Sequence, residues 1–242
     1  MPDKKIHNPL YARAENYWVQ SRHPVVSLVF IAPLMVIYEA GVVLWGVQNG
    51  ADAWMRQFLD LLGFSQHLLL PLLTVCVLLC WHYLTHEPWR FSPGVISPMV
   101  AECLLLAICL QVVLVFQSTL FLAMEKTAES SVAAKMVGYL GAGIYEELLF
   151  RLILLSATVW LIRRWWTAQN PSLVLAVLVS SFIFAAAHYV GHAGDTFQWF
   201  SFLFRFMAGI FFSILFIYRG FGIAAGAHAA YDILAILFIR SF

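Results

Sequence analysis

The chain of 242 residues is 62% hydrophobic and 11% charged, and its formal net charge at pH 7 is +1. With a mean hydropathy of +0.82, it has too little polar surface to cover a soluble globule of this size. The small net charge gives no argument for nucleic acid or an acidic substrate as a partner. The composition therefore predicts a polytopic membrane protein.

The first 23 residues are polar and precede the first apolar run. They carry four basic residues, and Tyr17 and Trp18 lie where the chain would reach a membrane surface. This pattern predicts a cytoplasmic tail, residues 1–23, with an interfacial anchor. The apolar run at about 24–45 is too long for the core of a signal peptide, so we expect an uncleaved first span. Residues 53–63 have the apolar periodicity of an amphipathic helix that lies in the interface.

Six further apolar runs have about the length that a membrane-spanning helix needs. They lie at about 67–83, 98–122, 132–162, 173–190, 200–218 and 223–239. The sequence thus predicts an all-α, polytopic helical membrane protein with about seven, or eight, transmembrane helices. Residues 1–242 are expected to form a single integral membrane domain, because no repeat or long polar connection divides them. When Lys and Arg are counted in alternate connections, eight lie on the side of the N-terminus and four on the other side. This excess favours a cytoplasmic N-terminus.

Two adjacent glutamates and an arginine lie inside the apolar run at 132–162, as Glu146, Glu147 and Arg151. A charged group at the centre of a bilayer costs on the order of 3 kcal/mol by insertion scales, so such groups usually mark a functional interior site. In an α-helix Glu147 and Arg151 share a face, whereas Glu146 is turned away by about 100°. Arg151 is therefore predicted to pair with Glu147 and to leave Glu146 facing other groups.

Two histidines follow in later apolar runs, each among small residues, as His188 and His228. Small residues let helices approach closely in lipid, so these flanks favour tight packing around a shared polar centre. Asp232 lies four residues after His228 on the same helix face, where a carboxylate can fix the imidazole tautomer. Glu146, the two histidines and Asp232 in one dry cavity would form a hydrolytic centre.

The motifs together resemble those of the CAAX-protease and bacteriocin-processing family (CPBP), also called Abi proteins. Residues 146–151 match the family's EExxxR motif, residues 184–188 match FxxxH, and residues 228–232 match HxxxN/D. The order of the motifs and their placement on successive helices match as well, over residues 130–240. The resemblance implies an intramembrane endopeptidase whose catalytic core is this region, with the active site inside the helix bundle.

The resemblance also implies a role for each motif residue. Glu146 would be the general base that takes a proton from the attacking water. His188 would position that water and pass the proton to the leaving amine. His228 would donate a hydrogen bond to the tetrahedral oxyanion. Glu147 and Arg151 would form a second layer that supports these groups.

Asp232 stands where many relatives have Asn, whose amide can donate a hydrogen bond to the oxyanion. Either apolar surroundings hold Asp232 protonated or it orients His228, and we favour the orienting role. For Arg205, inside the run at 200–218, we favour a pairing with Asp232 or Glu147 over contact with a substrate carbonyl. Glu39 lies near a span end, where an interface position explains it without chemistry.

The same residues would also suit a metal. Glu146, His188 and His228 would give a His₂Glu zinc set with an open position for water. The chain has no HExxH motif, and catalysis without a metal cofactor is favoured over zinc. In straight helices, Glu146 and His188 would lie about 24 Å from the cytoplasmic ends of their spans, whereas His228 would lie only about 12 Å from the end of its span. We therefore expect either a break at the glycines near 220–226 or strong tilt of the helices.

The sequence predicts an intramembrane endopeptidase, a hydrolase that cleaves a peptide bond of a membrane-associated protein or peptide. The alternative is a non-enzymatic membrane scaffold or bacteriocin-immunity protein on the same fold. A proton-coupled transporter would show inverted repeats and a second set of buried charges, and neither is evident in the sequence. The expected partners are the substrate and the lipid bilayer, with no nucleic acid. The expected location is the bacterial inner (cytoplasmic) membrane.

Overall fold

The computed structural model describes residues 17–64, 68–121, 132–166, 168–191 and 194–239. These residues form helices and no strand, with 84% of the structure helical, so the predicted all-α class is confirmed. Most of the predicted cytoplasmic tail, with Lys4, Lys5 and Arg13, lies outside the described residues. In chain order the elements are α2 (Pro24–Trp45), α3 (Gly50–Leu61), α4 (Leu69–Leu84), η1 (Pro93–Val95), α5 (Ile96–Phe121), α6 (Val132–Gly141), η2 (Ala142–Leu155), α7 (Ser156–Trp165), α8 (Gln169–Ala187), α9 (Trp199–Arg219) and α10 (Phe221–Ile239).

Within the described residues, four helical segments are long and apolar enough to cross a membrane. They are α2, α8, α9 and the segment Pro93–Val115, which comprises η1 and most of α5. Helix α4 and the part of α10 at Phe221–Leu237 are apolar but shorter. The predicted run at 132–162 forms three consecutive elements instead of one regular helix. The structure is that of a helical membrane protein, but it supports four spans by length and composition, not seven.

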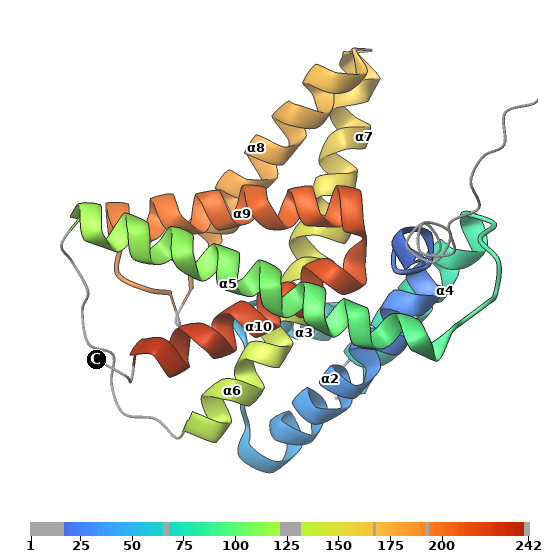
Figure 1. Cartoon of the computed structure of the whole chain (residues 1–242), viewed down its shortest axis with the longest axis horizontal. Coiled ribbons are helices and arrows are strands. Elements are labelled where there is room, and N and C mark those ends of the chain that lie inside the picture. Colours follow the sequence, from blue (N-terminus) through green and yellow to red (C-terminus); the bar gives the residue numbers. More distant parts are fainter. Residues whose placement is uncertain (1–16, 65–67, 122–131, 167, 192–193, 240–242) are drawn as a thin grey trace, which may run out of the picture.

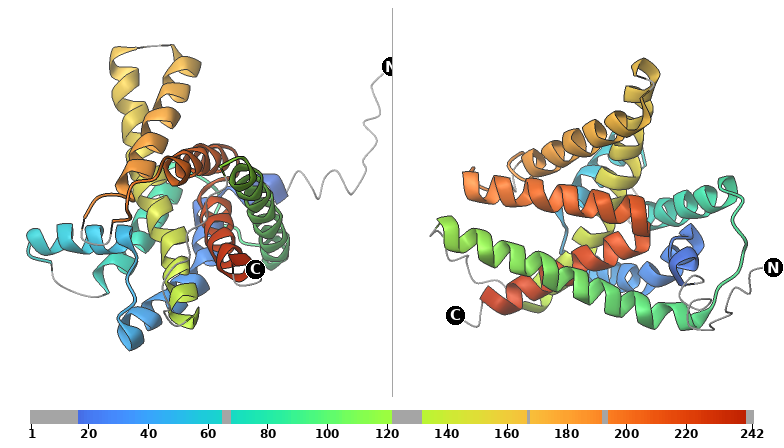
Figure 2. Two further views of the ribbon diagram at one scale, coloured as in Figure 1. Left: turned by 90° about the vertical axis from the view of Figure 1, so that its left-hand side faces the viewer. Right: turned by 45° about the horizontal axis from the view of Figure 1, so that its top comes forward.

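Helix α10 lies at the centre of the arrangement, in contact with α2, α5, α6, α9 and η2. Helices α5 and α9 run side by side, and α10 crosses beside them (Figure 1). Helices α7 and α8 form a hairpin that projects from the rest of the molecule, as the two views of Figure 2 show. The elements are steeply inclined to one another. Inclination of the helices, together with the central place of α10, thus brings residues of different depth along their helices to one site.

The glycines near the start of α10 do not break this helix, which is continuous from Phe221. The sharp change of direction precedes it, at Gly220, whose φ of 81° lies in a region that favours glycine. A Cβ at Gly220 would also lie 3.1 Å from the backbone of Arg22. Of the expected breaks near 220–226, the structure therefore shows one at Gly220, between α9 and α10, and none at Gly222 or Gly226.

Small residues allow α10 to approach its neighbours closely on two sides. A Cβ on Gly143 of η2 would lie 2.6 Å from the carbonyl oxygen of Ala225. On the other side, a Cβ on Gly226 would lie 2.6 Å from the ring of Phe30 and 2.8 Å from Sγ of Cys103. The tight packing that was predicted from the small residues around His228 is confirmed.

The segment that carries the two glutamates is a π-helix, η2, and not the α-helix that the sequence predicted. Its hydrogen bonds span five residues, so each turn is wider than in an α-helix. Such helices are rare beyond a single turn and are frequent at functional sites. Most of the residues of η2 that face inward, including Glu147 and Arg151, are buried.

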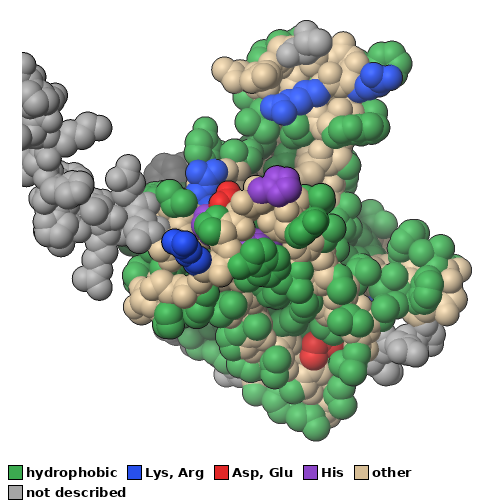
Figure 3. Space-filling model, turned by 90° about the vertical axis from the view of Figure 1, so that its right-hand side faces the viewer, with side chains coloured by type: hydrophobic (Ala, Val, Ile, Leu, Met, Phe, Trp, Pro, Cys, Tyr) green, Lys and Arg blue, Asp and Glu red, His purple; other side chains and the backbone are tan. Residues whose placement is uncertain are grey.

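The surface is mostly hydrophobic. In Figure 3, apolar side chains cover much of the face shown, and the charged side chains form small groups. The projecting hairpin carries basic side chains at its tip, where Arg163 and Arg164 occupy the last turn of α7. No residue of α7 is buried within the protein. An apolar surface with a basic tip suits a lipid environment whose edge lies near these arginines.

Replacement of Gly143 by Ala is expected to destabilise the protein by about 1–3 kcal/mol, because the added methyl group must push the backbones of η2 and α10 apart. The matched control is Gly94→Ala, where the added Cβ would meet Ser92 Oγ at an ordinary 3.7 Å. Thermal unfolding in detergent measures both. Equal melting temperatures for the two variants would contradict the close approach.

Candidate active site

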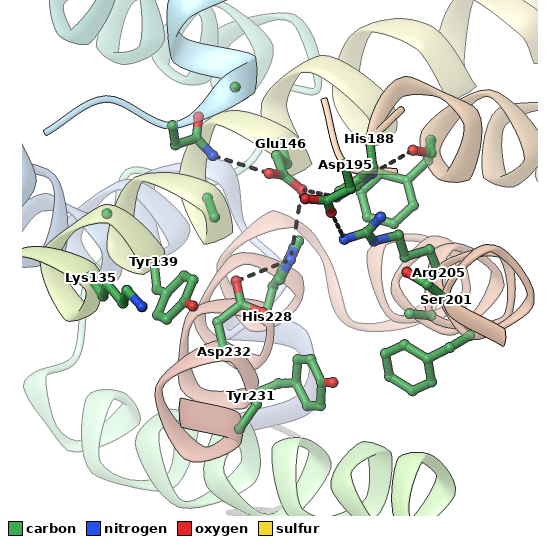
Figure 4. A pocket seen from close by; sticks show the side chains of 18 of the residues that line it. Lys135, Tyr139, Glu146, His188, Asp195, Ser201, Arg205, His228, Tyr231 and Asp232 are labelled. Carbon is green, nitrogen blue, oxygen red and sulfur yellow. Dashed lines mark hydrogen bonds and ion pairs between the residues drawn. The ribbon is translucent and has the colours of Figure 1, made fainter. Parts of the chain in front are cut away.

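Three elements bring the four predicted catalytic side chains together. Glu146 comes from η2, His188 is the residue that caps the C-terminal end of α8, and His228 and Asp232 come from α10. All four line one cavity of about 920 Å³. Figure 4 shows Glu146 above His228 and Asp232, with His188 to one side. The structure therefore assembles the full predicted set in a single place.

The carboxylate of Glu146 faces both imidazoles. Its Oε2 lies 3.8 Å from Nε2 of His188 and 3.8 Å from Nε2 of His228. These separations are too long for direct hydrogen bonds. A polar contact of this length can be bridged by a water molecule. The side chain of Glu146 is 13% exposed, so it opens into the cavity while its stem is enclosed by protein.

His188 is held by a hydrogen bond to the backbone of its own helix. Its Nδ1 lies 2.8 Å from the carbonyl oxygen of Phe184, and only an N–H can donate to that oxygen. In the neutral ring Nε2 therefore carries a lone pair, and this atom faces Glu146. The ring also makes an edge contact with Phe184, with centroids 4.8 Å apart.

His228 is held on both sides. Its Nδ1 donates to Oε1 of Glu147 at 2.7 Å, and its ring stacks on Phe212 with centroids 4.4 Å apart. Its Nε2 faces Glu146 and lies 3.6 Å from Oδ2 of Asp232, beyond the length of a good hydrogen bond. Glu147, and not Asp232, thus makes the hydrogen bond that orients the ring.

Glu147 also pairs with Arg151, as the sequence predicted. Arg151 NH1 lies 3.0 Å from Glu147 Oε1, and the two side chains are 1% and 0% exposed. The guanidinium stacks over the ring of Phe184, 4.2 Å from its centroid. This one carboxylate oxygen therefore links Arg151 to His228. The spacing in the sequence predicted the pairing of Glu147 with Arg151 but not its extension to the imidazole of His228.

Sequence reasoning missed Asn49, the residue that holds the other oxygen of Glu146. The Nδ2 of Asn49 donates to Glu146 Oε1 at 3.1 Å, across 97 residues of sequence. Asn49 is the N-cap of α3, the amphipathic helix predicted to lie in the interface. Asn is a common N-cap residue, so the local sequence does not distinguish Asn49 from an ordinary helix cap.

The interpretation of Glu39 as an interface residue without further function was incomplete. Glu39 pairs with Arg56 at 3.0 Å and accepts a hydrogen bond from Tyr145, the residue before Glu146, at 2.5 Å. Arg56 also pairs with the fully buried Asp52 at 2.6 Å. A second set of buried charges therefore exists, contrary to the sequence interpretation, and in it Arg56 pairs with two carboxylates.

Arg205 does not pair with Asp232 or Glu147, so that prediction was wrong. It forms an ion pair with Asp195 in the connection between α8 and α9, and its guanidinium lies 5.1 Å from the ring centroid of Tyr189. Both Arg205 and Asp195 line the cavity. The two residues thus place a paired positive and negative charge beside the catalytic candidates.

Within the part of the chain that the structure describes, no group of three or more His, Cys, Asp or Glu side chains is arranged to hold a metal ion. Zn²⁺ would need Glu146, His188 and His228 about 2.0–2.2 Å from one centre. These three are the donors that would hold it, and they converge on one point of the cavity at larger spacing.

The fold and the site define a helical membrane protein with a buried acid–base centre of two histidines and two carboxylates. Residues 128–234 match the family model described as type II CAAX prenyl endopeptidase Rce1-like. The match includes every predicted site residue, and it confirms the resemblance to the CAAX-protease family. This is a family of proteases, so the match supports a peptidase. The comparison with curated proteins found no match, and the comparison with solved structures found none.

Replacement of Arg151 by Leu is expected to destabilise the protein by about 3–5 kcal/mol, because it leaves the buried Glu147 without its cation. Arg164→Leu, in the exposed last turn of α7, is the matched control and should change stability little. The measurement is thermal unfolding of both purified variants in the same detergent. A melting temperature for Arg151→Leu equal to that of the control would contradict the inferred role of the pair.

Proposed function

We propose that the protein is an intramembrane endopeptidase that hydrolyses a peptide bond of a membrane-associated protein or peptide. The observation that carries the proposal is the placement of Glu146 Oε2 at 3.8 Å from Nε2 of both His188 and His228. A carboxylate that faces two imidazoles in a cavity supplies the base and the proton carriers that hydrolysis by an activated water requires. The match of residues 128–234 to a protease family supports the same activity.

In the first step, a water held between Glu146 and His188 attacks the carbonyl carbon of the scissile bond. Glu146 acts as general base and accepts a proton from this water, while the lone pair on His188 Nε2 orients it. The new C–O bond forms as the carbonyl double bond opens, which leaves a tetrahedral intermediate with a negative oxygen.

In the second step, the proton reaches the leaving nitrogen through Glu146 and His188, the C–N bond breaks, and the carboxylic acid and the amine separate. The oxyanion is stabilised by His228. In its doubly protonated form this ring donates from Nδ1 to Glu147 and presents an N–H at Nε2 to the cavity. Loss of one such donor typically lowers the rate by about 10²–10³.

Asp232 faces the same nitrogen of His228, at 3.6 Å. We propose that it stabilises the N–H at Nε2 between catalytic cycles and so contributes indirectly to the oxyanion site. Glu147 and Arg151 then keep the ring in place from the other side. This division of roles places the orienting hydrogen bond on Glu147 and leaves Asp232 beside the reacting groups.

The family description names a CAAX prenyl endopeptidase, which makes a prenylated C-terminal segment the first substrate to test. We propose cleavage near the C-terminus or a transmembrane end of the substrate. The catalytic core is residues 130–240 of a single integral membrane domain, in the bacterial inner membrane with the N-terminus on the cytoplasmic side. The distribution of Lys and Arg supports this orientation.

A non-enzymatic scaffold on the same fold remains the second candidate, and it requires neither a free carboxylate nor an open cavity beside it. A transporter is the weaker alternative, although the structure does contain a second set of buried charges. Glu39 and Asp52 are each paired with Arg56, whereas a coupling-ion site needs groups that exchange their partners.

Replacement of Glu146 by Gln keeps the shape of the side chain and removes the base, so we expect cleavage to fall by at least about 10². Two measurements test this: accumulation of uncleaved precursors in membranes, by proteomics, and cleavage of a prenylated peptide with a C-terminal CAAX sequence by the purified protein. Glu87→Gln, in the connection between α4 and η1, is the matched control with a partly exposed side chain. Wild-type processing by a folded Glu146→Gln variant would move the scaffold interpretation to first place.

We also propose that hydrolysis does not require a metal cofactor. Purified protein treated with a strong chelator and then freed of it is expected to keep its rate of peptide cleavage, with less than one equivalent of bound Zn²⁺ by elemental analysis. The opposite result would be loss of activity on chelation and recovery on addition of Zn²⁺. That result would assign Glu146, His188 and His228 to a zinc site of the His₂Glu type.

A further inference from the structure

Asn49 occupies a position with two separable functions. It is the N-cap of α3, where its Oδ1 accepts a hydrogen bond from the backbone N–H of Asp52 at 2.8 Å. Its Nδ2 donates to Oε1 of Glu146 at 3.1 Å. The assignment of oxygen and nitrogen in this amide follows from its partners, because the backbone N–H needs an acceptor and the carboxylate needs a donor. The cap therefore directs the amide nitrogen at the catalytic carboxylate.

The backbone of Asn49 is fixed as well. Its N–H donates to the hydroxyl of Tyr38 at 3.1 Å, and that hydroxyl in turn donates to Oδ2 of Asp52 at 2.8 Å. Tyr38 and Asp52 are both fully buried. Asn49 thus forms three hydrogen bonds, to Tyr38, Asp52 and Glu146, and together they determine where its side chain points.

These contacts belong to a closed ring that begins and ends at Glu146. From Asp52 the ring continues to Arg56 at 2.6 Å and from Arg56 to Glu39 at 3.0 Å. Glu39 accepts from Tyr145 at 2.5 Å, and Tyr145 precedes Glu146 in the chain. The ring joins α2, α3 and η2 by side chains that are buried or nearly so. It connects α3 to the π-helix at Glu146 itself and, through Glu39 of α2, at Tyr145, the residue before it.

We propose that Asn49 is a positioning residue for the reaction, which sets the rotation of the Glu146 carboxylate so that Oε2 faces both imidazoles. The proposal rests on the proposed peptidase function, in which Oε2 accepts the proton of water. With Oε1 held by Asn49, only Oε2 is directed to the two Nε2 atoms at 3.8 Å. Misplacement of a reacting group by about 1 Å can cost about 10² in rate, so this orientation matters for catalysis.

The test uses two substitutions that keep the cap of α3. Serine caps a helix nearly as well as asparagine but lacks the amide that reaches Glu146. For Asn49→Ser we expect kcat to fall about tenfold or more, with KM for the prenylated CAAX peptide unchanged within about twofold and the melting temperature retained. Asn49→Asp keeps both size and cap but turns a carboxylate toward Glu146, and its loss of kcat should be larger. Asn170→Ser, at the exposed start of α8, is the control.

The outcomes separate this proposal from the function on which it rests. If Glu146→Gln is inactive while Asn49→Ser has wild-type kcat, the positioning role is wrong and the peptidase stands. If Glu146→Gln cleaves as wild type does, the proposed function and the positioning role both fall. A double-mutant cycle of Asn49→Ser and Glu146→Ala, which removes the acceptor oxygen, tests the contact in thermal unfolding without any substrate. Additive effects in that cycle would overturn the proposal, and a coupling between the two sites would support it.

Discussion

A buried carboxylate needs a partner, and the two adjacent glutamates of η2 meet this need in different ways. Glu147 is fully buried and shares one oxygen between Arg151 and His228. An unpaired charge in its place would cost several kcal/mol, so this pairing is a condition for the fold. Glu146 is held at one oxygen only, and the other faces the cavity. Because its neighbour carries the structural ion pair, Glu146 remains available for chemistry.

The backbone makes this difference between neighbours possible. Consecutive side chains of a helix point in different directions, so Glu146 and Glu147 reach separate surroundings, while Glu147 and Arg151, four residues apart on η2, lie close enough to pair. The close approach of α10 at Gly143 then brings His228 within reach of both carboxylates. The different directions of the two glutamates and the small residues at the helix contact are therefore two parts of one solution. They bring an imidazole between groups that a regular, bulkier packing would keep apart.

The sequence predicted the residues that the structure brings together at the cavity, because ionisable groups stand out inside apolar runs. It also predicted the helical class and the close packing of α10, which depend on composition. The π-helix left no signal, since a run that is apolar on every side has no periodicity to distinguish one helix type from another. The prediction of seven spans was wrong for a related reason. The apolar composition of residues 132–162 does not reveal that this run is divided into three elements. Asn49 and Glu39 were missed because their partners lie 97 and 106 residues away.

The N-terminal half of the chain is more than an anchor for the region that matches the family. The family match covers residues 128–234 and contains every motif residue, yet the hydrogen bond that fixes Glu146 comes from Asn49, outside this region. Helix α3 has a buried N-terminal turn at Asp52, whereas Phe58 and Leu61 near its other end are 61% and 81% exposed. One end thus serves the site while the other presents apolar surface to the membrane interface. A chain that kept the three motifs but not this helix would need another donor for Glu146, because the motifs do not supply one.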